Sequence, residues 1–116
     1  MTAITYNNGL NMNNTNNPIG VFQQEAPEVS KAFDALIEAL KNTPGLDAKT
    51  KQLLYIGIKA AHGDTAAIYY HVAMAKKMGA TRDEIKDAIL ITLTVCGLTG
   101  VVTCLPVALR VYDETV

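Results

Sequence analysis

The sequence predicts an all-α fold, and three observations lead to this expectation. Apolar residues recur at helical spacing after residue 25, and no segment shows the alternation of a strand. Residue types that start helices precede these segments, and residue types that end helices follow them. Small aliphatic residues dominate the 49% hydrophobic composition, whereas aromatic residues make up only 6%. Such a composition suits closely packed helices.

Residues 1–24 form a separate compositional block, which we expect to be a flexible N-terminal arm. Asparagine is crowded into this block, and its side chain competes with the backbone for hydrogen bonds and disfavours regular helix. The alternative is an arm that packs across a neighbouring subunit, with Ile19, Val21 and Phe22 as its anchors.

Residues 25–116 are expected to form one helical domain. Its first helix is predicted to begin at Pro27, a favoured first-turn residue, and to end where asparagine, proline and glycine gather at 42–45. A second helix is predicted from an Asp47 N-cap to about Ala61. This second helix is apolar on most sides, which indicates a central position.

The third helix is expected to start after an Asp64 cap and to run to Met78, with Gly79 just beyond its end. Thr81 and Glu84 then match a capping box, which starts the next helix.

That fourth helix continues at helical spacing to Cys96. Gly97 and Gly100 are expected to break it, and a final helix is expected to reach Arg110 or beyond.

The charge and the termini exclude several classes of function. A net charge of −1 leaves no basic footprint for nucleic acid. The N-terminus lacks the pattern of a secretory signal, so a cytoplasmic location is expected. The uncharged span from Ala88 to Leu109 is long enough for a membrane helix. We prefer the interpretation that it is a helix buried in a bundle and its oligomer interface, and we expect no membrane contact.

The two cysteines, Cys96 and Cys104, are too few for a disulfide framework. Their apolar surroundings favour reduced core residues. Eight residues of straight helix would separate them by about 12 Å, whereas a disulfide requires Cα atoms within about 7 Å. A thiol-dependent redox pair formed by a turn at 97–100 is the alternative.

His71 lies within an otherwise apolar helix and is the main candidate for chemistry. A histidine among apolar residues is often a satisfied core residue, and this alternative stays open. His62, Asp64 and His71 offer no dense ligand motif, so neither a metal nor another cofactor is expected.

The order and spacing of several residues resemble the carboxymuconolactone decarboxylase and alkylhydroperoxidase D-like family over about residues 27–113. The matching residues are Phe33, Leu46, Asp47, Lys51, Gln52, Leu53, Leu54, His71, Gly79, Thr81, Glu84, Ile85 and Gly97. The resemblance implies an all-α fold around an antiparallel helix pair, assembled as a homotrimer or homohexamer.

The resemblance also aligns the active-site positions of the peroxidase branch with this chain. Its two cysteines fall at Asp64 and Ala67, and its relay glutamate falls at Gln52. Neither Asp64 nor Ala67 supplies a thiol, and the Gln52 amide accepts no proton at neutral pH. Cysteine-dependent peroxidase activity is therefore not expected at this site.

The decarboxylase branch of the family implies a different chemistry. His71 would be the acid/base group acting on a small carboxylated lactone or organic acid, with Gln52 and Asp64 as positioning residues. Thr99 replaces a proline common in that branch, and Ile91 replaces a second histidine of some members. A non-catalytic oligomeric ligand-binding or scaffold protein is the alternative.

Overall fold

A computed structural model describes residues 18–116, and all regular secondary structure in this range is helical. The all-α prediction is therefore confirmed. The chain divides into two compact units, Met1–Gly45 and Leu46–Val116, each of which is considered by itself.

The first unit contains α1 (Pro18–Glu25) and α2 (Pro27–Lys41). Residues 18–24 were expected in the flexible arm, and α1 corrects this expectation; residues 1–17 lie outside the described part of the chain. The Phe22 ring packs edge-on against Phe33 of α2, with 6.2 Å between ring centroids. This contact buries apolar surface and so stabilises a helix that the residue propensities alone did not predict.

Helix α2 forms where the sequence predicted it, with proline in its first turn. Its apolar stripe stays largely open to solvent. The large side chains of this stripe are 44–62% exposed, namely those of Val29, Phe33, Leu36 and Leu40.

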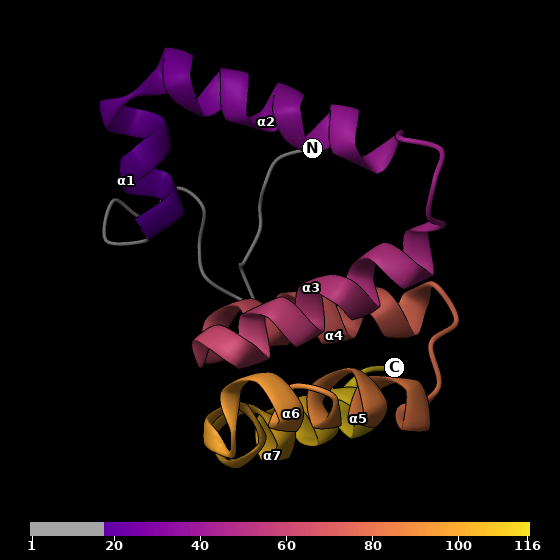
Figure 1. Cartoon of the computed structure of the whole chain (residues 1–116). Coiled ribbons are helices and arrows are strands. Elements are labelled where there is room, and N and C mark those ends of the chain that lie inside the picture. Colours follow the sequence, from indigo (N-terminus) through magenta and orange to yellow (C-terminus); the bar gives the residue numbers. More distant parts are fainter. Residues whose placement is uncertain (1–17) are drawn as a thin grey trace. The chain divides into compact units, whose positions relative to one another are not determined.

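The second unit contains α3 (Ala48–His62), α4 (Thr65–Lys77), α5 (Arg82–Leu90), α6 (Leu93–Cys96) and α7 (Thr99–Glu114). Helices α3 and α4 pack against each other as the expected antiparallel pair, because the connection between them is only two residues long. In Figure 1, α5, α6 and α7 form a second layer, in which α5 packs on α3 and α7 packs on α4.

Local signals place the helix boundaries of this unit as predicted. The Asp47 carboxylate accepts a hydrogen bond from the Thr50 amide at 2.7 Å, and Thr81 and Glu84 form the capping box. Gly63 and Gly79 end α3 and α4 with φ angles of 70° and 97°, which glycine adopts without steric cost.

The core of the second unit lies between its two layers. Each long helix contributes small or branched aliphatic side chains, and Cys104 is buried among them. The fully buried members include Ile56, Ala60, Ile68, Val72, Ala75, Ile85, Ile89, Cys104 and Ala108.

The predicted helix from Thr81 to Cys96 is wrong in its C-terminal part. α5 ends at Leu90, and the buried Thr92 hydroxyl donates to the Ile89 carbonyl oxygen at 2.7 Å. This bond offers the backbone a local alternative to continued helix. Gly97, with φ 68°, breaks the chain again as expected, but Gly100 lies inside α7.

The uncharged span from Ala88 to Leu109 is thus divided among α5, α6 and α7. Within residues 18–116, no helix combines the length and the apolar character needed to cross a membrane.

Candidate functional site

His71 lies on the buried face of α4 and is only 8% exposed. Its Nδ1 atom is 2.8 Å from the Gln52 Oε1 atom of α3. The Tyr55 ring stacks on the imidazole with 5.0 Å between centroids, and the Tyr70 ring meets it edge-on at 5.1 Å. His71 is therefore held by one polar contact and two aromatic contacts.

Helix α3 supplies one stripe of residues toward His71. Gln52, Tyr55 and Lys59 follow one another at spacings of three and four, which places them on one helix face. Gln52 was expected from the sequence, whereas Tyr55 and Lys59 were missed. The sequence feature that could have identified Tyr55 and Lys59 is this polar and aromatic stripe along a helix that is otherwise mostly apolar.

The hydrogen bond to Gln52 defines where the imidazole carries its proton. Because an amide oxygen only accepts, Nδ1–H of His71 donates to Gln52 Oε1, and Nε2 keeps its lone pair. Burial, the largest cause, and the nearby Lys59 charge together lower the pKa of His71 to about 4, against a smaller opposing effect of the Asp64 carboxylate. His71 is therefore neutral at pH 7, and its Nε2 is a hydrogen-bond acceptor.

Asp64 does not make the direct contact with His71 that a catalytic carboxylate would make. Its carboxylate caps α4 by accepting from the Ala67 amide at 3.0 Å, and it lies 3.5 Å from Lys59 Nζ. Its influence on His71 is electrostatic. Of the two predicted positioning residues, the structure brings Gln52 into contact with His71 and leaves Asp64 at the helix start.

The two thiols differ from the expected core pair. Cys104 is buried, and burial raises the pKa of its thiol, which disfavours a reactive thiolate. Cys96 is exposed, so its predicted burial is wrong; both thiols are free. In the described range, 18–116, no three His, Cys, Asp or Glu side chains gather as a metal site.

Restoring a carboxylate at position 52 is expected to change the charge state of His71. In a Gln52→Glu variant, a carboxylate beside Nδ1 is expected to raise the pKa of His71 by roughly 2, because the negative charge stabilises imidazolium. An NMR titration of the imidazole measures this change. Gln24→Glu makes the same substitution on the exposed surface of α1 and should leave the titration of His71 unchanged. An unaltered pKa in Gln52→Glu would contradict the contact.

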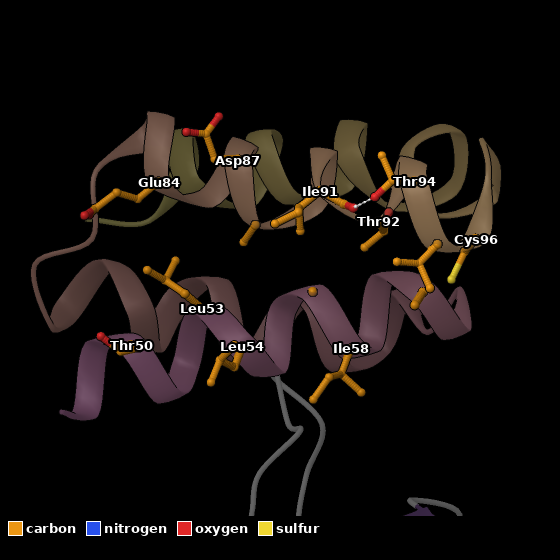
Figure 2. A pocket seen from close by; sticks show the side chains of 14 residues that line it. Thr50, Leu53, Leu54, Ile58, Glu84, Asp87, Ile91, Thr92, Thr94 and Cys96 are labelled. Carbon is orange, nitrogen blue, oxygen red and sulfur yellow. Dashed lines mark hydrogen bonds between the residues drawn. The ribbon is translucent and has the colours of Figure 1, made fainter. Parts of the chain in front are cut away.

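A cavity of about 780 Å³ lies on a different side of α3, between this helix and α5 and α6 (Figure 2). Leu54, Gly57 and Ile58 line it from α3, at helix positions facing away from Gln52 and Tyr55. His71 does not line it. The cavity and the histidine are therefore separate features, and the cavity was not predicted from the sequence.

Comparison with known proteins gives two matches. The sequence profile of the carboxymuconolactone decarboxylase family matches residues 27–110. An uncharacterized protein of Cupriavidus necator is 24% identical over 85 residues, which cover 73% of this chain and 75% of that protein. No solved structure matches the chain significantly.

Proposed function

Because the chain belongs to the carboxymuconolactone decarboxylase family, we propose that it is a decarboxylase-like enzyme acting on a small carboxylated lactone or organic acid. His71 is its acid/base group. The observation that carries this proposal is the buried neutral imidazole, whose Nδ1–H is held by Gln52 while Nε2 stays unprotonated.

Decarboxylation breaks the bond between carbon and the carboxylate group and leaves the electron pair as an enolate. Carbon dioxide departs, and the carbon that lost it takes up a proton. A substrate carboxylate placed beside His71 raises the pKa of the imidazole, so that Nε2 gains a proton from water on binding. His71 then donates that proton from Nε2 to the enolate carbon and returns to its neutral form.

Gln52 and Asp64 act as positioning residues in this proposal. Gln52 keeps the proton on Nδ1 and so reserves Nε2 for the substrate. Asp64 holds the start of α4 and the Lys59 ammonium near the site. Lys59 adds a positive charge that attracts a carboxylate substrate.

The test is the release of carbon dioxide from a panel of carboxylated lactones by the wild type and by a His71→Ala variant. A loss of turnover of about 100-fold or more is expected, as for removal of a general acid/base. His62→Gln, at an exposed histidine, serves as the control and should keep full turnover. Turnover by His71→Ala equal to that of the wild type would overturn the assignment.

Gln52 favours a second candidate, a non-catalytic ligand-binding or scaffold protein. An amide at this position does not relay a proton, unlike the glutamate that the peroxidase branch carries there. Under this alternative, small organic acids shift the NMR signals of His71, and no carbon dioxide is released from any lactone in the panel.

We also propose a homo-oligomeric state, a homotrimer or homohexamer, supported by the large apolar side chains that the single chain leaves exposed. A cytoplasmic location is part of the proposal, because the free thiols Cys96 and Cys104 suit a reducing compartment.

A further inference from the structure

The cavity between α3, α5 and α6 is an open apolar groove with protruding apolar side chains along its rim. Leu54 and Ile58 of α3 are 50% and 52% exposed, and Ile91 and Val95 across the groove are 70% and 83% exposed. We propose that this groove is the contact face for the same groove of a second copy of this chain. The proposal rests on the homo-oligomer proposed above and specifies a surface for its homohexameric form, because a contact between like grooves needs a two-fold axis, which a cyclic homotrimer lacks. It is independent of the chemistry of His71.

The size of the apolar face fits a protein partner. Leu98 and Val102, each 67% exposed, follow Val95 along the chain and extend the apolar surface. Six large aliphatic side chains in this part of the chain are at least half exposed, and apolar side chains gathered on one face mark surfaces that contact other proteins. A standard interface takes roughly 800 Å² from each partner.

The charges of the groove favour a second copy in an antiparallel arrangement. Figure 2 shows Glu84 and Asp87 at one end of the groove and Cys96 at the other end. No charged residue occurs from Ala88 to Leu109. In a two-fold contact, the acidic end of one copy lies over the uncharged end of its partner, so like-charge repulsion does not oppose assembly.

The face combines a hollow with protruding side chains. A hollow of about 780 Å³ lies beside the exposed side chains of Ile91 and Val95, so each copy offers both a recess and side chains that fill it. A small-molecule site of this volume has polar groups that converge on its ligand. The Glu84 carboxylate at this groove is instead engaged within the chain, by Lys49 Nζ at 3.1 Å and by the Thr81 amide at 2.8 Å. This arrangement favours a protein partner over a small molecule.

Sedimentation of the full chain over a wide concentration range tests the proposal, together with a Val95→Lys variant. Wild-type protein is expected to assemble, and Val95→Lys is expected to lose that assembly while keeping its helical circular dichroism. Val116→Lys, at an exposed C-terminal valine, adds the same charge outside the groove and should assemble normally.

Alkylation of the wild-type thiols gives a second readout that needs no variant. Cys96 lines the groove and is exposed in the single chain, so its alkylation is expected to slow several-fold as protein concentration rises. Cys104 is buried in the single chain and serves as the internal reference.

The proposal is overturned by a monomer at all concentrations. It is also overturned by an oligomer that Val95→Lys leaves intact and in which Cys96 reacts at an unchanged rate. That second outcome would leave the homo-oligomer standing and reject only this surface. Neither outcome bears on the turnover test of His71.

Discussion

Replacing Gly100 with alanine is expected to lower the free energy of unfolding by about 2 kcal/mol, measured by urea denaturation. A Cβ atom at this position would lie 2.6 Å from the Ala60 carbonyl oxygen and 3.1 Å from Thr92 Oγ1. The first neighbour is backbone, so α7 must move away from α3. Overpacking of this kind costs up to about 3 kcal/mol, and the better helix propensity of alanine returns about 1 kcal/mol.

Gly45→Ala is the matched control for this substitution. A Cβ atom at Gly45 meets nothing within 4 Å, so the change is expected to stay within about 0.5 kcal/mol. Equal stabilities for Gly100→Ala and Gly45→Ala would contradict the close approach of α7 to α3.

Acid is expected to remove about 3 kcal/mol of stability between pH 6.5 and pH 4 through His71 alone. The folded protein lowers the pKa of His71 from 6.5 to about 4. Within this window the unfolded chain binds a proton that the folded chain excludes, so stability falls as pH falls. Above pH 6.5 both states are neutral at this residue, and the contribution of His71 is constant.

Urea denaturation of the wild type and a His71→Phe variant at pH 7, 5.5 and 4.5 measures this effect. In the His71→Phe variant, most of the decline in the free energy of unfolding over this pH window should disappear, whereas His62→Gln should keep the same decline as the wild type. The carboxylates with a pKa below the ordinary value are those of Asp47, Glu84 and Asp113, and their contributions to stability are lost at or below the bottom of this window. Parallel curves for the wild type and His71→Phe would show that His71 titrates normally.

The sequence predicted the helices whose boundaries depend on local chemistry. Asp47, Asp64 and Thr81 cap helices in the structure, and Gly79 follows the end of α4. Each of these signals acts within a few residues of itself and is therefore visible in the sequence.

The misassigned elements depend on contacts between segments or on weak local competition. α1 forms beside an asparagine-rich block, where Phe22 meets Phe33 of the next helix. The end of α5 follows from the hydrogen bond between the Thr92 hydroxyl and the Ile89 carbonyl, in a stretch whose apolar spacing predicts continued helix.

The candidate site was predictable only in part, because some of its features depend on how the helices pack against one another. The family pattern singles out His71 and Gln52, and the structure brings their side chains together. The roles of Tyr55 and Lys59 depend on which face of α3 meets α4. The groove depends on how α5 and α6 lie across the opposite face of α3, which periodicity does not define.

His71 is a neutral imidazole with its proton on Nδ1 and its lone pair on Nε2. The nitrogen-15 NMR spectrum of the His71 ring, followed as a function of pH, measures both this tautomer and its pKa. The predicted result is a protonated Nδ1 and an unprotonated Nε2 at neutral pH, with a titration midpoint near the pKa of about 4. A proton on Nε2 at neutral pH, or a midpoint near the ordinary 6.5, would contradict the account.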